Sequence, residues 1–352
     1  SDGVEEAVYV KDQSIDFCRK QALKAAMMQS AKLLNSSSFD EIEKLIKDAL
    51  VLGTDNNFGH DFHKDALRRF ELAARDPITT GWSQMDEICK GGLGNSELGV
   101  VVAPTGAGKS MVLVHLATQA LLLGKTVVYY TLELKDTTVG QRFDCCLTKT
   151  HLGEHKQKKE EILKKIEDID GTLIIKEYPT KSASVQTIKN HIEKLRKRGI
   201  NPDIILLDYA DLLRPVRSSS EKRHELEETY EGLRGLAQSY DIPCWTASQT
   251  NRGGLNAEVI TMEAISEAFN KCFVADFIFS LSRTTLDKQS NKGRVFIAKN
   301  RNGPDGIVFD AHVDWSDVTI NILDRNESVE KMQTTTEARK ILKEKYEQLQ
   351  RK

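Results

Sequence analysis

The segment Leu98-Gly-Val-Val-Val-Ala-Pro-Thr-Gly-Ala-Gly-Lys-Ser110 decides the fold of this chain. It reads as an apolar strand, a glycine-rich turn and the start of a helix, which is the layout of a P-loop. Gly106 and Gly108 allow the backbone to aim N–H groups into one concavity, where phosphate oxygens can accept from them. Lys109 is predicted to reach the β- and γ-phosphates, and Ser110 to ligate Mg²⁺. The predicted nucleotide-binding residues are Ala103, Pro104, Thr105, Gly106, Ala107, Gly108, Lys109, Ser110 and Met111.

The pattern around this segment predicts an α/β fold. Short apolar runs separated by crossover-length helical stretches are typical of a mainly parallel sheet covered on both faces. We expect the strand over 126–132 to lie beside the P-loop strand. The predicted strands cover residues 98–102, 126–132, 172–175, 204–207, 244–247, 277–281 and 295–298.

Polar residues at the ends of these strands are candidates for catalysis. Asp208 ends an apolar run, as expected of a second Mg²⁺ ligand beside Ser110. Glu133 follows the strand over 126–132, and a carboxylate at that edge faces the ligand crevice and could orient water; the alternative is a solvent-exposed glutamate. Glu177 holds a similar but more peripheral position. Gln249 follows another strand and could sense the γ-phosphate through its amide.

Two cations, Lys299 and Arg301, precede a tight turn at Gly303-Pro304. Held there, they could stabilise charge on a transferring phosphoryl group. The alternative is a basic surface hairpin.

Composition limits the other function classes. The chain has 352 residues and a formal net charge of −2, so polyanion binding must come from a local basic patch. The six cysteines form no C-x-x-C pair, which indicates reduced packing thiols in a cytosolic protein. With no signal peptide and no long apolar run, we expect a cytoplasmic protein without a membrane segment. The start at Ser1 suggests that the native protein extends upstream.

The ends of the chain have their own patterns. Residues 14–35 show a wide apolar helical face, and Ser38 with Glu41 forms a capping box for a second helix that ends at Gly53. These helices need a partner to cover their apolar faces. We therefore divide the chain into a helical docking region (1–75), an ATPase domain (76–325) and a charged tail (326–352). The tail helix over 337–352 is either solvated or disordered, or docks a partner.

Five motifs in order carry a family resemblance. An entry segment, Thr79-Thr-Gly-Trp-Ser-Gln-Met-Asp86 with Gly91-Gly-Leu-Gly94, precedes the P-loop. Then follow Tyr130-Thr-Leu-Glu-Leu134, Ile205-Leu-Leu-Asp-Tyr-Ala-Asp-Leu212, Ser248-Gln-Thr-Asn-Arg252 and Lys299-Asn-Arg-Asn-Gly303. Together they resemble the RecA-like ATPase domain of DnaB-type replicative helicases, in a form closest to phage relatives. Ala103 in place of the first P-loop glycine, and the missing N-terminal collar domain, are departures from that family.

The resemblance implies an ATP- and Mg²⁺-dependent 5′–3′ DNA helicase that forms hexameric rings around single-stranded DNA. It implies that Glu133 activates water, and that Lys299 and Arg301 reach the γ-phosphate of the neighbouring subunit. A primase and a helicase loader are the implied partners, and the host cytoplasm the location if a phage encodes the protein. The helix over 15–34 would resemble the linker helix that docks on the next protomer.

Two loops are candidates for DNA binding. The resemblance implies that the loops lining the central channel follow the strand that ends before Asp208 and the strand that ends before Gln249. Cations in a flexible loop suit a phosphate backbone, and without aromatic residues sequence preference should be weak. The alternative for both is a solvated loop. The candidates are Arg214, Arg217, Lys222 and Arg223 in the first loop, and Asn251, Arg252, Gly253 and Gly254 in the second.

Other functions share the same nucleotide motifs. A RecA-like recombinase or a clock-type ATPase would differ at the Lys-x-Arg turn and in the channel loops. A nucleotide-gated assembly or loader module would use ATP only to time a binding event.

Overall fold

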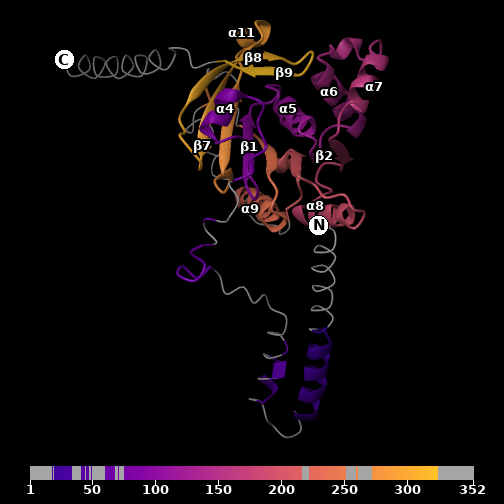
Figure 1. Ribbon diagram of the computed structural model, residues 1–352, viewed down its shortest axis with the longest axis vertical. Helices are drawn as coiled ribbons and strands as arrows, with labels where there is room; N and C mark the ends of the chain where they lie inside the picture. The colour runs from indigo at the N-terminus through magenta and orange to yellow at the C-terminus, as the bar shows by residue number, and fades with distance from the viewer. Residues whose placement is uncertain are drawn as a thin grey trace, which may run out of the picture. The chain divides into compact units, whose positions relative to one another are not determined.

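The computed structural model describes residues 18, 20–33, 41–43, 45–46, 49, 60–67, 70, 75–215, 222–250, 259–260 and 272–323. The chain divides into two compact units, Ser1–Ala73 and Ala74–Lys352. The second unit is a twisted sheet with helices on both faces (Figure 1).

The sheet of the second unit has nine strands in the order β3-β2-β4-β5-β1-β6-β7-β8-β9 within the described residues. The first six in this order pair in parallel, and the last three are antiparallel. We call the edge where the parallel strands begin the amino edge and the edge where they end the carboxyl edge. The strands are β1 Leu98–Ala103, β2 Thr126–Thr131, β3 Thr172–Glu177, β4 Ile204–Asp208, β5 Cys244–Gln249, β6 Phe277–Ser282, β7 Lys292–Asn300, β8 Val308–Asp314 and β9 Thr319–Ile322.

The helices divide between the two faces. One face packs on α4, α5 and α6 through residues such as Val101, and the other packs on α8 and α9 through residues such as Val100. All six residues of β1 are buried, as its continuous apolar run predicts. The helices are α4 Ser83–Ile88, α5 Lys109–Leu122, α6 Asp136–Thr148, α7 Lys159–Glu167, α8 Val185–Arg196, α9 Lys222–Tyr240 and α11 Thr285–Gln289, with short 3₁₀ turns η2 Leu152–Glu154 and η3 Ala210–Leu212.

The predicted α/β fold class is confirmed, and each of the seven predicted strands is present. Strands β8 and β9 were not predicted, because they are half-buried and carry polar residues such as Asp310 and Asn321. The expectation that β2 lies beside the P-loop strand is wrong. Strands β4 and β5 lie between β2 and β1. Parallel strands are joined by crossovers that can skip positions in a sheet, so local sequence does not state their order.

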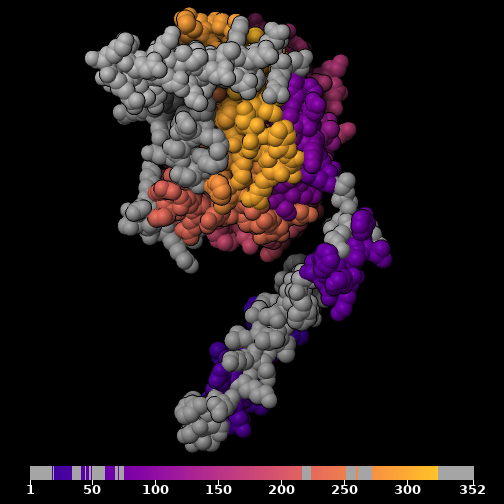
Figure 2. Space-filling view, turned by 90° about the vertical axis from the view of Figure 1, so that its left-hand side faces the viewer, coloured from indigo at the N-terminus to yellow at the C-terminus, as the bar shows by residue number. Residues whose placement is uncertain are grey.

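Residues 75–97 contain the predicted entry segment and take that name from here on. They contact the C-terminal strands through Trp82 and Ile88, and Figure 2 shows purple residues beside the yellow C-terminal strands. The indole N–H of Trp82 donates to the carbonyl of Ile320 at 2.8 Å. The Trp82 ring also stacks on His115 of α5, with ring centroids 4.4 Å apart. This segment therefore joins α5 to β9.

In the first unit, residues 20–33 form a helix within the predicted span of 14–35, and Met27 and Met28 are 57% and 63% exposed. Residues 41–43, 45–46 and 49, within the second predicted helix, are also helical. The predicted tail helix lies outside the described residues. No helix in the described part of the chain combines the length and the apolarity needed to cross a bilayer.

Candidate nucleotide site

The P-loop joins the buried end of β1 to the start of α5. Gly106 and Gly108 have φ values of 73° and 106°, in the left-handed region that favours glycine. The Ala107 N–H donates to the Pro104 carbonyl at 3.2 Å and closes the turn. Helix α5 begins at Lys109 with Gly108 as its N-cap, so its first N–H groups face the loop. This local geometry is that of an anion-binding helix terminus.

Asp208 ends β4 at the carboxyl edge and is fully buried. It accepts hydrogen bonds from the hydroxyls of Ser110 and Tyr129. Its Oδ1 atom has no hydrogen-bond partner among the described residues. Burial, together with the nearby Glu133 carboxylate, raises the pKa of Asp208 above its ordinary value. A buried carboxylate oxygen left unpaired is costly unless a cation meets it.

A carboxylate with two hydroxyl neighbours and one oxygen without a hydrogen-bond partner among the described residues fits a hard divalent cation that keeps water ligands. Among the described residues, no group of three or more histidine, cysteine, aspartate or glutamate side chains forms an alternative metal site. Ser110 and Asp208 could hold Mg²⁺, because their oxygens lie together and one carboxylate oxygen has no hydrogen-bond partner among the described residues.

Gln249 ends β5 and connects the P-loop to β4. Its side-chain N–H donates to the Thr105 hydroxyl at 2.7 Å, and its oxygen accepts from the Tyr209 hydroxyl at 3.3 Å. The Lys109 ammonium lies 5.3 Å from the centre of the Tyr209 ring. Tyr209 was not among the predicted site residues, although it directly follows Asp208 in the sequence.

Glu133 lies two residues after β2 and is exposed at the carboxyl edge. The preceding Leu132 N–H donates to the Asp208 carbonyl at 2.9 Å, which brings Glu133 beside the end of β4. Burial, with the Glu133 charge next, raises the pKa of Tyr209 to about 12. Glu133 therefore reaches this site although β2 is not adjacent to β1.

Sequence reasoning missed a group that the antiparallel strands bring to the P-loop. The Trp315 ring lies 2.1 Å from where a Cβ of Gly108 would be, so a side chain at Gly108 would displace it. The Arg283 guanidinium lies 5.7 Å from the Trp315 ring centre. The Lys288 ammonium lies 3.9 Å from the Cβ position of Gly106. These residues follow the P-loop by more than 170 positions, and no local pattern connects them to it.

The turn that carries Lys299 and Arg301 (residues 299–302, the cation turn) lies at the amino edge. Lys299 pairs with Ile278 near the start of β6, and the Arg301 N–H donates to the Asp276 carbonyl at 3.0 Å. The Asp276 N–H in turn donates to the carbonyl of Leu98, the first residue of β1. The P-loop follows the last residue of β1, so the length of that strand, roughly 16 Å at about 3.3 Å per residue, separates the two groups. The structure does not bring the cation turn to the P-loop of its own chain.

The remaining predicted residues are distributed as follows. Met111, in the first turn of α5, packs against the core. Arg214 is exposed and follows η3, and Arg223 on α9 pairs with Glu227 at 2.9 Å. Outside the described residues lie Arg217, Asn251, Arg252, Gly253, Gly254 and the side chain of Lys222.

The fold and the site define a class. A mainly parallel sheet with a P-loop after β1 and a buried carboxylate at the end of β4 is that of a RecA-like P-loop nucleotide-binding domain. A sequence profile of the DnaB-like helicase C-terminal domain matches residues 77–321. The chain belongs to this family.

Individual proteins with similar sequences are replicative helicases, in agreement with this family assignment. The chain is 28% identical over 261 residues to the DnaB-like replicative helicase of enterobacteria phage T4, covering 69% of this chain and 54% of the relative. It is 25% identical to the replicative DNA helicase DnaC of Bacillus subtilis, covering 89% and 69% of the two chains. The chain spans about half the length of the first curated relatives it matches.

Two solved structures share the fold. One, described as an ATPase domain, has a TM-score of 0.65 at 16% identity and covers 76% of this chain and all of that one. The other is a DnaB-like replicative helicase described with its interactions with primase; it has a TM-score of 0.63 at 16% identity and covers 88% and 78% of the two chains. At this identity the likeness establishes the fold.

Proposed function

We propose that this chain is the ATP-hydrolysing motor of a replicative DNA helicase that moves 5′–3′ along single-stranded DNA. The observation that carries the proposal is the separation of two half-sites in one subunit. The P-loop, Asp208 and Gln249 lie at the carboxyl edge, and Lys299 and Arg301 lie at the amino edge. A complete phosphoryl-transfer site would then form only between two copies.

Each residue at the carboxyl edge has a proposed role. Lys109 holds the β- and γ-phosphates, and Ser110 and Asp208 hold Mg²⁺, which neutralises charge on the phosphates when bound. Glu133 takes the proton of the attacking water. Gln249 is hydrogen-bonded to Thr105 of the P-loop and ends β5, so a shift of the P-loop when the γ-phosphate leaves would move the end of β5. Trp315 offers an aromatic face beside Gly108 of the P-loop, which suits a nucleotide base. Arg283 is buried and donates to the carbonyls of Lys292 and Val313, so its proposed role is to support the Trp315 ring.

A second observation, an apolar cavity together with an exposed helix face, supports the proposed assembly into a ring. Between α6 and α7 lies a cavity of about 490 Å³ with an apolar wall, where Leu163 and Ile166 are 48% and 43% exposed. The helix over 20–33 carries the exposed Met27 and Met28. We propose that this helix, as part of a linker region over 1–75, docks in that cavity on the next protomer of a hexamer.

The remaining assignments follow from the family. We propose that Arg214, Arg217, Lys222 and Arg223, with residues 251–254, contact DNA phosphates. We also propose a primase and a helicase loader as partners, and a cytoplasmic location, that of the host if a phage encodes the chain. Lys222 and Arg223 were predicted in a loop, but they begin α9, and the Arg223–Glu227 pair makes Arg223 the weakest of the four candidates for DNA binding.

DNA-dependent assays test the motor. Single-stranded DNA is expected to stimulate ATP hydrolysis by the chain, and a fork with a 5′ tail is expected to be unwound. Strand exchange without unwinding would indicate a recombinase instead. If the rate of ATP hydrolysis is the same with and without DNA and no duplex is unwound, the chain would instead be an assembly module or a clock-type ATPase.

Mixed protomers test the shared site. Glu133→Gln and Arg301→Ala proteins are each expected to be nearly inactive alone. In an equal mixture, an intact site needs Glu133 from one protomer and Arg301 from the other, so about one site in four recovers if assembly is random. Lack of recovery at every ratio would contradict a cation turn that acts on a neighbour.

A further inference from the structure

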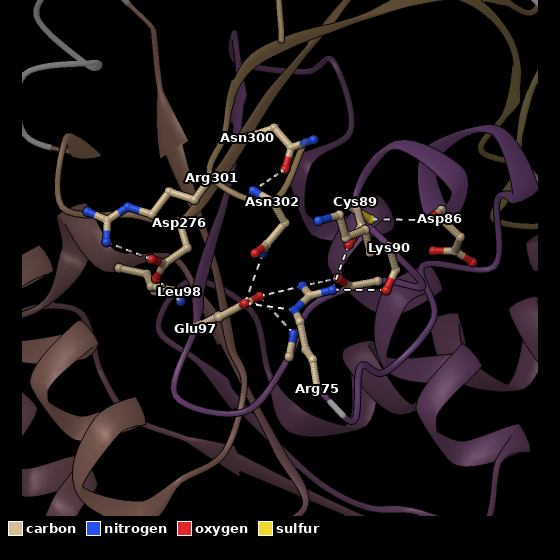
Figure 3. A network of polar contacts seen from close by, with 12 residues as sticks. Arg75, Asp86, Cys89, Lys90, Glu97, Leu98, Asp276, Asn300, Arg301 and Asn302 are labelled. Carbon is tan, nitrogen blue, oxygen red and sulfur yellow. Dashed lines mark hydrogen bonds and ion pairs between the residues drawn. The ribbon is translucent and has the colours of Figure 1, made fainter. Parts of the chain in front are cut away.

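The cation turn is held to its own subunit at two points, and both use a carboxylate (Figure 3). The first is Asp276, which is 4% exposed and precedes β6. Its side chain forms an ion pair with Arg301 Nη1 at 3.2 Å, and its backbone carbonyl accepts from the Arg301 N–H at 3.0 Å. Main chain and side chain of Arg301 are therefore both fixed on one residue.

This arrangement orients Arg301 without enclosing it. The Arg301 side chain is 46% exposed, and the ion pair with Asp276 uses Nη1. A guanidinium has five N–H donors in a rigid fork, so an ion pair at Nη1 restrains the side chain and leaves further donors on a part-exposed group. A phosphate oxygen of another chain could accept from those donors.

Asp276 also has other partners. Arg234 of α9 donates to it through Nη2 at 2.9 Å and Nε at 3.2 Å, and the Leu98 N–H donates at 3.0 Å. The guanidinium groups of Arg234 and Arg301 thus share the Asp276 carboxylate. The Lys299 ammonium is close enough to interact with all three charges. Burial, with repulsion from Arg301, lowers the pKa of Lys299. The cluster carries more positive than negative charge, which favours an incoming anion.

The second holding point is Glu97, directly before β1. Its Oε1 accepts from the Asn302 side-chain amide at 3.0 Å, and its Oε2 accepts from Arg75 Nη2 at 2.6 Å. Burial acts to raise the pKa of Glu97, but hydrogen bonds from Arg75 and Gly94 outweigh it and keep the pKa below its ordinary value. Glu97 therefore remains an anion that fastens the far end of the turn.

Arg75 connects this anchor to the chain that enters the domain. Its guanidinium also donates to the carbonyls of Cys89 and Gly92, each at 2.6 Å. The entry segment, the start of β1 and the cation turn thus form one hydrogen-bonded unit.

We propose that Asp276 and Glu97 are positioning residues that hold the cation turn in the orientation in which Lys299 and Arg301 meet the phosphates of a neighbouring subunit. The proposal rests on the proposed shared site between subunits. Neither carboxylate contacts the nucleotide in this scheme; each acts through Arg301 or Asn302.

Asp276→Asn in the full chain is the main test. The amide keeps an acceptor for the Leu98 N–H but loses the charge that orients Arg301. With DNA present, kcat for ATP hydrolysis is expected to fall roughly tenfold, while KM for ATP changes less than about twofold. A folded Asp276→Asn protein with kcat within about twofold of the parent would overturn the proposal.

Asp203→Asn is the matched control. Asp203 accepts the N–H of Thr126 at the start of β2, at 2.7 Å, as Asp276 does for Leu98 at the start of β1. The structure shows Asp203 holding a strand and not the cation turn. Its substitution is expected to leave kcat within about twofold, so a purely structural effect of removing such a carboxylate would appear in both variants.

Mixtures then locate the defect. Asp276→Asn protomers are expected to recover activity with Glu133→Gln protomers, which supply an intact turn, and not with Arg301→Ala protomers. Recovery with Arg301→Ala to the level reached by Glu133→Gln would overturn the positioning role. Failure of the Glu133→Gln and Arg301→Ala pair itself would instead contradict the shared site.

A second route covers the case in which Asp276→Asn does not fold. Glu97→Gln and Asn302→Ala break the other holding point and are put through the same two mixtures. The same pattern, recovery with Glu133→Gln and none with Arg301→Ala, is expected. Recovery of either variant with Arg301→Ala would overturn the proposal.

Discussion

The two edges of the sheet differ in how their polar groups are assembled. At the carboxyl edge, one continuous segment supplies the P-loop, and single residues at the ends of β2, β4 and β5 complete it. At the amino edge, the cluster draws on the entry segment, α9, the start of β6 and the end of β7. Backbone N–H groups dominate the first and side-chain ion pairs the second. The residues proposed to bind phosphate through main-chain N–H groups are thus close together in the sequence. The position of the cations that would complete the site depends instead on tertiary contacts.

Strand β1 connects these edges. Its first residue, Leu98, donates its N–H to Asp276, and its last residue, Ala103, leads into the P-loop. A fully buried strand in the centre of a sheet fixes the distance between its ends. Both edges of one subunit therefore have a fixed separation, as the proposed site shared between two copies would require.

The largest expected effect is at the P-loop. Lys109→Ala removes the cation proposed to hold the β- and γ-phosphates and should reduce ATP hydrolysis by about a thousandfold or more. Steady-state turnover with DNA measures it, and circular dichroism controls for folding. Turnover close to that of the parent would show that the site assignment is wrong.

Glu133→Gln should separate binding from chemistry at the same edge. The amide cannot accept the proton of water, so hydrolysis should fall roughly 10²- to 10³-fold, while ATP affinity changes little. Glu177→Gln is the control, because Glu177 ends the outermost strand, β3. Equal losses in both variants would remove the reason to assign the base to Glu133.

Reversing the charge of Arg214 and Arg217 should weaken binding to single-stranded DNA. Loss of two phosphate contacts reduces the slope of log affinity against log salt by about 1.4. Lys194→Glu is the control, because Lys194 is exposed on the outer side of α8, which packs on the sheet, and should not contribute. Fluorescence anisotropy over a salt series gives the slope, and an unchanged slope would exclude this loop from the DNA interface.

Trp315→Ala should affect the carboxyl edge through the nucleotide base. Loss of an aromatic face is expected to raise KM for ATP about five- to tenfold with a smaller change in kcat. Trp315→Phe keeps a ring and should restore much of the affinity. If both variants behave alike, the ring does not contact the base.

The smallest effect concerns stability and pH. The pKa of Asp208 is raised in the folded state, so the folded protein binds that proton more tightly than the unfolded chain. Its free energy of unfolding should therefore fall as pH rises from the ordinary carboxyl pKa through the raised one. Asp208→Asn removes the buried carboxylate charge and its unpaired oxygen. The free energy of unfolding should therefore rise by roughly 1 kcal/mol at neutral pH without Mg²⁺.

Urea unfolding at several pH values measures this difference. Added Mg²⁺ and nucleotide should reverse the order, because the parent gains a ligand that the variant has lost. A variant that is less stable than the parent at neutral pH would indicate that Asp208 is already well paired.

Much of the fold could be predicted from local patterns. The apolar run of β1, the spacing of Gly106 and Gly108, and Asp208 at the end of β4 follow from short-range rules. Strands β8 and β9 were not predicted, although β8 alternates buried apolar residues with polar ones, the pattern of a strand with one exposed face. The place of β2 in the sheet was predicted wrongly. Trp315 and Tyr209 entered the site only through contacts with Gly108 and Gln249.

The sequence by itself determined the phosphate-binding loop, because glycine conformations, a helix start and a lysine act within a few residues of each other. It also determined which strand ends carry acids and amides. Only the tertiary structure decided that Lys299 and Arg301 lie at the amino edge, and that Asp276 and Glu97 hold them there. Strand order and ion pairs between distant segments arise from packing the whole sheet, and a local sequence pattern does not contain that information.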